Sequence, residues 1–313
     1  MSPEKMVVMA NQIAAFFNTQ PGDPAPKVAA HLADFWEPRM RTQLQDYIRA
    51  GGAGLAMGLD NPLGPGHIVV RRGKHLVGHV DGLGMNQCLA VEAEIGSENC
   101  LKARLDVRSR EDWAAAIKDF REATEGAMNV LFNNAGIGRH GWFEDITGED
   151  NDAIIDINVK GVVNGVQASL SLLKATSGAR IVNTASTAGV VGSPQLAVYS
   201  ATKFAVRGLT EALDAEFRDL DIRVTSLMPW FIETPILEMG DRDGSNHKMS
   251  DQLKENGMNV YPVSMAAERA WDAAHGKDTH FMVGKDAERA RFMARWLPGA
   301  IQKRVKAGVP PRD

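Results

Sequence analysis

The chain has 313 residues, of which 44% are hydrophobic and 24% are charged, and its formal net charge is −4. This length allows one large domain or two smaller ones, each with a sizeable core. The slight acidic excess excludes a global electrostatic footprint for nucleic acid, and no apolar run reaches the roughly 18 residues of a membrane span. Cys88 and Cys100 lack CxxC spacing and the N-terminus lacks a signal-peptide pattern, so we expect a cytoplasmic protein with reduced thiols.

Residues 1–57 predict a small helical segment. Met6, Met9 and Ile13 recur at helical spacing, and similar apolar patterns follow along this segment. Residues 58–66 contain three glycines and two prolines, which is typical of a linker.

From residue 67 onward, the pattern alternates between strands and helices. Strands are expected at 75–81, 100–107, 128–136, 179–186 and 222–229, and helices at 84–96, 109–126, 148–175 and 197–219. Short, nearly continuous apolar strands between helices indicate parallel βαβ units in a sheet that is covered on both faces. We therefore predict an α/β fold with a doubly wound parallel sheet, whose ligand lies outside the carboxyl ends of the strands.

Tyr199 and Lys203 are four residues apart, so they lie on one face of the helix expected there. An ammonium beside a phenol stabilises the phenolate and lowers the phenol pKa, which suits a general acid/base near neutral pH. The spacing alone is common, and a helix that merely carries one tyrosine and one lysine is the simpler interpretation.

Three further polar features precede this pair at the expected sheet edge. Ser186 ends the strand before the helix, Asn158 lies in the preceding long helix, and NNAG (133–136) closes another strand. Each is ordinary by itself, since serine and glycine are common turn formers. Their order and spacing together favour one functional site.

These motifs resemble the short-chain dehydrogenase/reductase family over about residues 67–300. The matching segments are NNAG, NVKG (158–161), Ser186, YSATK (199–203) and LMPWFIETP (227–235). The resemblance implies a Rossmann-like domain at 67–285 and an NAD(P)-dependent oxidoreductase that acts on an alcohol or ketone. It also implies a small-molecule substrate and a homo-oligomer.

The resemblance also implies roles for individual residues. Tyr199 would be the acid/base, Lys203 would lower its pKa and hold the nicotinamide ribose, Ser186 would bind the substrate oxygen, and Asn158 would anchor a water that relays protons. No metal is expected. The implied cofactor-binding residues are Asp81, Asp106, Asn133, Ala135, Gly136, Tyr199, Lys203, Pro229, Ile232 and Thr234.

The cofactor would be NAD or NADP. Asp81, taken as the end of the second strand, favours NAD because an acidic residue there accepts from the ribose hydroxyls and repels a 2′-phosphate. Substrate should be bounded by residues 138–146 and by the segment 235–260.

The sequence departs from the family pattern at the phosphate and nicotinamide ends of the expected cofactor site. The strand and TGxxxGxG turn that normally open the family's fold are not found, so the first strand is lacking or altered, with HIVV (67–70) as a poor replacement. Trp230 stands where the family usually has glycine and would crowd the nicotinamide. We expect NAD affinity no better than millimolar, since several charge-assisted hydrogen bonds are lost.

Residues 1–57 resemble the delta subunit of NAD-dependent formate dehydrogenase, which adds formate dehydrogenase subunits as candidate partners. The alternative to an active oxidoreductase is therefore an impaired dehydrogenase, or a fusion whose N-terminal part is an accessory module. Residues 286–313 predict a basic C-terminal helix or tail. Packing on its own domain or on a second subunit is the preferred interpretation, and an anionic membrane surface is the alternative.

Overall fold

The structure is a computed structural model that describes residues 66–71, 77–81, 100–234, 237, 253 and 257–309. The predicted N-terminal helical segment, nearly all of the linker, the helix at 84–96 and most of the segment 235–260 lie outside these residues. The boundaries proposed at 57 and 66 therefore stay predictions.

The described strands form one seven-stranded sheet in the order β3-β1-β2-β4-β5-β6-β7. β2 and β4 to β7 run parallel, whereas β1 is antiparallel to both of its neighbours. The strands are β1 Gly66–Arg71, β2 Val77–Asp81, β3 Cys100–Leu105, β4 Val130–Asn133, β5 Arg180–Thr184, β6 Arg223–Pro229 and β7 His280–Val283.

The centre of the sheet differs from the expectation. Residues 75–81 were expected as the second strand, but β2 lies directly beside β4, with Val80 opposite Asn133. The segment 66–71, expected at most as a poor central strand, lies one position further out and runs in the opposite direction. Both strands are short and β-branched-rich, so their sequence alone does not specify which one takes the central position.

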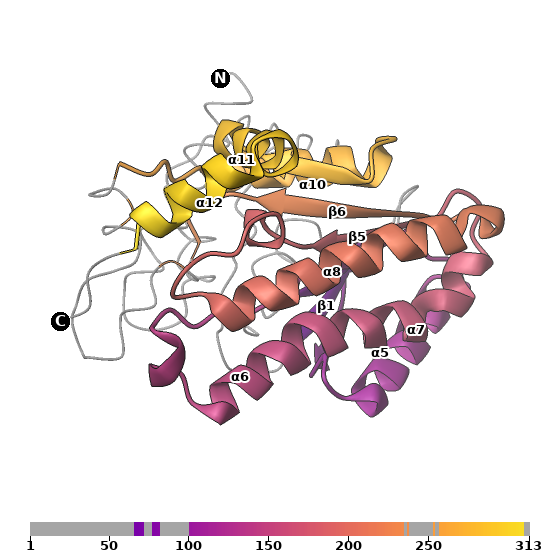
Figure 1. The fold of residues 1–313 in the computed structure, drawn as a ribbon. Coiled ribbons are helices and arrows are strands. Elements are labelled where there is room, and N and C mark those ends of the chain that lie inside the picture. The colour runs from indigo at the N-terminus through magenta and orange to yellow at the C-terminus, as the bar shows by residue number, and fades with distance from the viewer. Residues whose placement is uncertain are drawn as a thin grey trace, which may run out of the picture.

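Helices cover both faces of this sheet (Figure 1). α5, α7 and α8 pack on one face and α10 packs on the other, while α11 and α12 follow β7 at the end of the chain. The helices are α5 Arg110–Ala123, α6 Gly148–Ile155, α7 Gly161–Lys174, α8 Ala197–Glu216, α10 Val263–His275, α11 Lys285–Trp296 and α12 Pro298–Ala307. No helix in the described parts of the chain is long and apolar enough to cross a membrane.

Strand alternation explains how the sheet is buried on both sides. In β4, Leu131 joins the core under α5 and α7, while Val130 and Phe132 join the core under α10. β5 repeats the pattern with Ile181 on the first side and Val182 on the second. A sheet with two apolar faces needs helices on both, which confirms the Rossmann-like, doubly wound fold.

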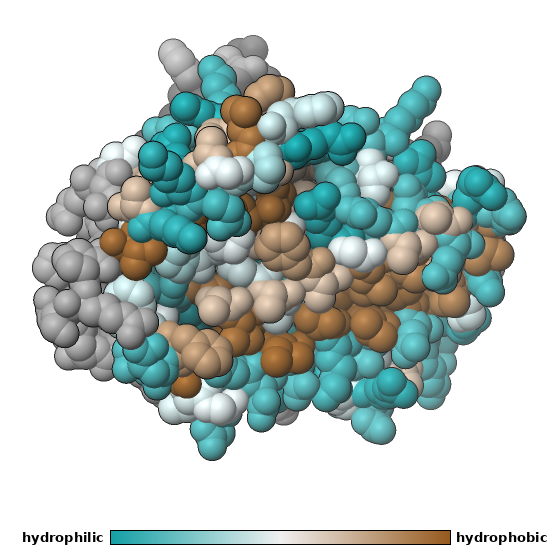
Figure 2. All heavy atoms as spheres, viewed as in Figure 1, coloured by the Kyte–Doolittle hydropathy of each residue, from teal (hydrophilic) through white to brown (hydrophobic). Residues whose placement is uncertain are grey.

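A band of apolar side chains follows α8 on the outer surface of the molecule (Figure 2). Phe204 is 42% exposed there, and Ala201, Ala205 and Ala212 are exposed along the same helix. This band is unlike the polar outer face expected of a helix on a monomer.

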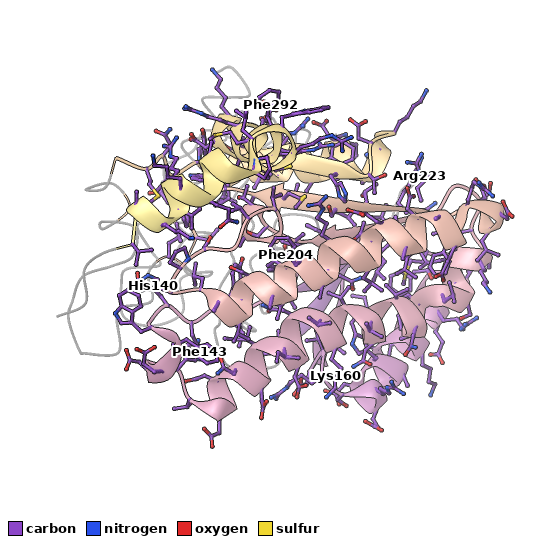
Figure 3. The ribbon with its side chains drawn as sticks, in the orientation of Figure 1. His140, Phe143, Lys160, Phe204, Arg223 and Phe292 are labelled. Atoms are coloured by element: carbon purple, nitrogen blue, oxygen red, sulfur yellow. The ribbon has the colours of Figure 1, made fainter. Side chains whose placement is uncertain are left out.

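The amino-terminal ends of β6 and β7 are tied to α8 by polar side chains. The Asp214 carboxylate accepts from the Arg223 guanidinium (3.1 Å) and from the Val224 amide (3.0 Å), and Arg223 lies at the far end of the molecule from His140 (Figure 3).

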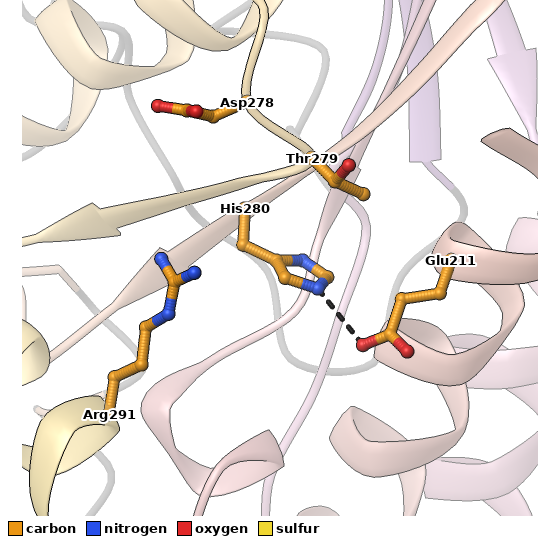
Figure 4. A pocket seen from close by; sticks show the side chains of 5 residues that line it. All are labelled: Glu211, Asp278, Thr279, His280 and Arg291. Carbon is orange, nitrogen blue, oxygen red and sulfur yellow. Dashed lines mark hydrogen bonds and ion pairs between the residues drawn. The ribbon is translucent and has the colours of Figure 1, made fainter. Parts of the chain in front are cut away.

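His280 at the start of β7 bridges two elements. Its Nδ1 lies 2.8 Å from the Ser226 hydroxyl of β6, and its Nε2 lies 2.9 Å from the Glu211 carboxylate of α8. His280 and Glu211 line a hollow of about 260 Å³ together with Asp278, Thr279 and Arg291 (Figure 4). Burial lowers the pKa of His280, and the hydrogen bond to Glu211 opposes this shift.

We predict that Gly165→Ala destabilises the fold by about 1–3 kcal/mol. A Cβ on Gly165 of α7 would collide with the Asn133 side chain and would lie 2.9 Å from the Trp113 ring. Gly208→Ala in α8 is the matched control, because a Cβ there meets nothing within 4 Å and alanine favours the helix by up to about 1 kcal/mol. Urea unfolding measures both, and equal midpoints for the two variants would contradict the packing described.

Because the His280 pKa is lowered, the stability of the folded protein should depend on pH. The folded state disfavours the imidazolium form, so the stabilising contribution of neutral His280 is present above about pH 6.5 and is lost as the pH falls through the lower folded-state pKa. We expect the melting temperature of the native chain to fall more between about pH 7.5 and pH 5.5 than that of His280→Gln. Parallel pH curves for the two proteins would show that His280 does not carry this effect.

Candidate functional site

The candidate site lies at the carboxyl ends of β4 and β5, where α8 begins. The loop 138–146 approaches this end of α8, and Figure 3 shows its His140 and Phe143 near the helix start. The Gly141 amide donates to the Gln195 carbonyl over 3.0 Å, which joins this loop to the residues just before α8.

Tyr199 and Ser186 are brought together as the sequence predicts. The Ser186 side chain lies near enough to the Tyr199 phenol to influence its pKa, and it caps a short 3-10 turn by accepting from the Ala188 amide at 3.1 Å. Burial raises the pKa of Tyr199, and the influence of Ser186 opposes this rise. The net direction is opposite to the lowering expected from the sequence.

Lys203 lies beside the phenol but does not lower the Tyr199 pKa below its ordinary value. Its ammonium is buried and lies 5.5 Å from the centroid of the Tyr199 ring, while it donates to the Thr184 carbonyl over 2.8 Å. Burial lowers the pKa of Lys203 to about 8, since the ammonium loses its hydration. Burial and Ser186, rather than Lys203, therefore set the direction of the Tyr199 pKa shift.

Asn158 lies in a π-helical turn, Asp156–Lys160, that interrupts the helix predicted as continuous over 148–175. Its side chain accepts from the Ile137 amide (2.8 Å) and donates to the Ile137 carbonyl (2.9 Å) and the Thr202 hydroxyl (3.1 Å). Asn158 therefore fixes the turn after β4 to α8. Such π-turns often occur at functional sites, and the proton-relay role of Asn158 stays a prediction.

Gly136 lies where these groups meet. A Cβ at this position would be 3.3 Å from both the Asn158 Oδ1 and the Lys203 Nζ, so a larger side chain would fill the space beside the ammonium. Ala135 before it is partly buried against the core under α5 and α7.

The Asn133 side chain does not point to the space beside Gly136 and the Lys203 ammonium. Its buried amide donates to the Asn183 side chain over 2.9 Å, and Asn183 in turn donates to the Thr210 hydroxyl of α8 over 3.0 Å. This ladder holds β4, β5 and α8 together.

The segment after β6 reaches the site from the other side. The Pro229 carbonyl accepts from the hydroxyls of Ser186 and Thr187, and the Thr234 hydroxyl donates to the Ile232 carbonyl over 3.3 Å. Ile232 is buried in the core under α10.

Trp230 packs against the core cluster between α8 and α11, and its ring meets Phe231 edge-on with centroids 5.3 Å apart. Its buried indole nitrogen has no hydrogen-bond partner among the described residues. Crowding of a nicotinamide by Trp230 stays a prediction.

Two predicted cofactor residues lie on or after other strands of the sheet. The Asp106 carboxylate binds the Arg108 guanidinium at both oxygens, with a shortest contact of 2.7 Å, and this exposed pair lies after β3. Asp81 ends β2 at the central position of the sheet, beside β4.

Sequence reasoning missed several residues that position the predicted ones. Thr184 supplies the carbonyl that holds Lys203, Thr202 supports Asn158, and Thr187 joins Ser186 at Pro229. The signal was present in the sequence, because Asn183 and Thr184 place adjacent polar residues at the end of an otherwise apolar strand.

A narrow pocket adjoins Tyr199. Side chains of the loop 138–146, of α6 and of the start of α8 line it, namely Arg139, Gly141, Phe143, Ile146, Asn151, Ile154, Gln195, Ala197, Val198 and Tyr199. Residues 138–146 contribute to this lining, and their role as a boundary of the substrate space stays a prediction.

The residues at the nicotinamide end fit the implied cofactor. Gly136 lies beside the Lys203 ammonium with no side chain between them, and Ser186 and Tyr199 lie at the same sheet edge. An ammonium approached by backbone alone suits ribose hydroxyls, which can accept its N–H groups.

Comparisons with known proteins extend over both parts of the chain. Residues 71–245 match the family described as short chain dehydrogenase, and residues 5–59 match the family of the NADH-dependent formate dehydrogenase delta subunit FdsD. The chain is 30% identical to SadH of Mycobacterium tuberculosis over 242 residues, which are 76% of this chain and 87% of SadH.

Two solved structures are similar in fold and sequence. A gluconate 5-dehydrogenase from Burkholderia cenocepacia, in complex with NADP and tartrate, gives a TM-score of 0.52 at 27% identity and covers 60% of this chain and 74% of its own. A 3-ketoacyl-(acyl-carrier-protein) reductase from Brucella melitensis, complexed with NADH, gives 0.50 at 28% identity over 58% and 75% of the two chains. With more than half of its residues matched, this chain belongs to the short-chain dehydrogenase family of oxidoreductases.

Proposed function

We propose that the chain is an NAD(P)-dependent oxidoreductase that interconverts a secondary alcohol and a ketone or other carbonyl compound. The observation that carries this proposal is the convergence of Ser186, Tyr199 and Lys203 after β5, with the buried Lys203 ammonium 5.5 Å from the centroid of the Tyr199 ring. Family membership and relatives with NADP or NADH support a nicotinamide cofactor.

The reduced nicotinamide, when bound, supplies the hydride that the carbonyl carbon accepts. Negative charge then develops on the carbonyl oxygen. The raised pKa of Tyr199 keeps the phenol protonated, so it can donate its proton to this oxygen while the Ser186 hydroxyl donates a hydrogen bond. In the reverse direction, the phenolate form of Tyr199, stabilised by the Lys203 ammonium, takes the alcohol proton and becomes the phenol.

The preference between NAD and NADP depends on the central strand. The order of the strands reverses between β2 and β4, and ligands of open α/β sheets bind at such a point. We infer that Asp81, at the carboxyl end of β2, is closer to the pyrophosphate than to the adenosine ribose. The NAD preference expected from the sequence would then be weak.

The apolar band on α8 supports the predicted homo-oligomer. Phe204 and the alanines beside it would be covered by a second copy of the chain.

A second candidate function rests on residues 5–59. Their match to the formate dehydrogenase delta subunit favours an accessory module that associates with formate dehydrogenase subunits, joined to a dehydrogenase with impaired cofactor binding. The two candidates differ in whether the purified chain turns over any alcohol or ketone by itself.

We predict that Tyr199→Phe lowers turnover by about 10²–10⁴-fold, because the proton donor is lost, with cofactor affinity nearly unchanged. Lys203→Ala should lower both the turnover and the affinity for the cofactor. Tyr261→Phe is the matched control, since its hydroxyl binds Asp286 over 2.8 Å and is not part of the pair. Rates are measured on a panel of secondary alcohols and ketones. A Tyr199→Phe enzyme that keeps most of its activity would refute the assignment.

We further predict that Asp81→Asn tightens binding of both NADH and NADPH by about three- to tenfold, because a carboxylate near the pyrophosphate is removed. Nicotinamide fluorescence titration measures both affinities, with millimolar binding expected for the native chain. If Asp81 instead reads the ribose, the variant will lose affinity for NADH and discriminate less against NADPH.

A further inference from the structure

α11 carries aromatic side chains on its outer face. Ala287 and Ala290 are buried and mark the inner face, whereas Phe292 and Trp296, four residues apart, are 59% and 63% exposed. Leu297, which follows directly, is 50% exposed. Figure 3 places Phe292 at the outer edge of the molecule, on α11. These three side chains form an apolar ridge that no described element covers.

Basic side chains surround this ridge. Residues 285–309 contain seven lysines and arginines but only one aspartate and one glutamate, in a chain whose net charge is −4. Arg289 and Arg295 lie on either side of the ridge by helical rotation, and the Arg295 guanidinium is 5.3 Å from the Trp296 ring centroid. Among the described residues, no ion pair engages Arg289 or Arg291.

We propose that α11 and α12 bind the surface of a lipid bilayer that contains anionic lipids. Phe292, Trp296 and Leu297 would enter the region between headgroups and acyl chains, where aromatic rings are favoured. The long stems of Arg289 and Arg295 would let their guanidinium groups reach lipid phosphates at the same time.

The shape and charge of the surface favour a bilayer over other occupants. The ridge stands out from a helix, so a protein partner would need a matching acidic groove with an apolar floor, whereas a bilayer adapts to the ridge. Nucleic acid would neutralise the arginines but would leave Leu297 without an apolar environment. Binding through this surface would determine where the enzyme acts. The proposal does not depend on which reaction the enzyme catalyses.

Co-sedimentation with vesicles tests the proposal on the full chain. We expect pelleting with phosphatidylcholine/phosphatidylserine vesicles, little with phosphatidylcholine alone, and a decrease as salt is raised. Phe292→Ser/Trp296→Ser should bind about tenfold more weakly, and Arg289→Gln/Arg295→Gln about tenfold or more. Phe143→Ser is the matched control, because Phe143 is 64% exposed on the opposite side of the molecule (Figure 3) and its loss should leave binding unchanged.

Three results would overturn the proposal. The first is equal pelleting with neutral and anionic vesicles, or none with either. The second is unchanged vesicle binding by the Phe292→Ser/Trp296→Ser variant with an intact melting transition. The third is an oligomer in lipid-free solution that this variant dissociates, which would identify the ridge as a contact between copies of the chain.

Discussion

The burial of the Lys203 ammonium is the constraint on which the rest of the site depends. A desolvated cation is costly unless it is paired or hydrogen-bonded, and here the Thr184 carbonyl accepts from it over 2.8 Å. That carbonyl is available only because β5 ends at Thr184. This hydrogen bond therefore couples the end of β5 to the position of α8, in addition to the bond between Asn183 and Thr210.

The elements around Lys203 approach one another unusually closely. A Cβ on Gly189 would lie 2.6 Å from the Lys203 carbonyl oxygen, so the 3-10 turn after β5 touches the backbone of α8. Gly136 makes the corresponding approach from β4. Glycine at both positions lets three chain segments converge without a side chain between them.

Much of the site was predictable from the sequence, because it depends on local spacing. Tyr199 and Lys203 share a helix, and Ser186 ends the strand before it, so their meeting follows from one βα unit. The pKa direction of Tyr199 was not predictable, because it depends on how much water the folded chain excludes. A pair of residues in a sequence indicates charge but not burial.

The fold, too, has features that local sequence predicts and features that depend on distant parts of the chain. The strands from β3 to β6 were predicted within a few residues, since each is an apolar run between helical patterns. The order of β1 and β2 was not, because strand order depends on partners far away in the chain. The π-turn at Asn158 was also missed, since one extra residue in a helical turn changes no apolar period clearly enough to detect.

The contact between Gly189 and the Lys203 backbone has a consequence for motion. α8 cannot slide or rotate there without displacing the turn that carries Ser186. Ser186 on that turn therefore keeps its position relative to Tyr199 and Lys203 on α8. If the proposed function holds, adaptation to substrates of different size would fall to the loop 138–146. Gly141 in that loop has a φ of +154°, a backbone conformation that other residues rarely adopt, so a larger residue there would strain the loop. The proposed chemistry and the proposed selectivity would then depend on different segments of the chain.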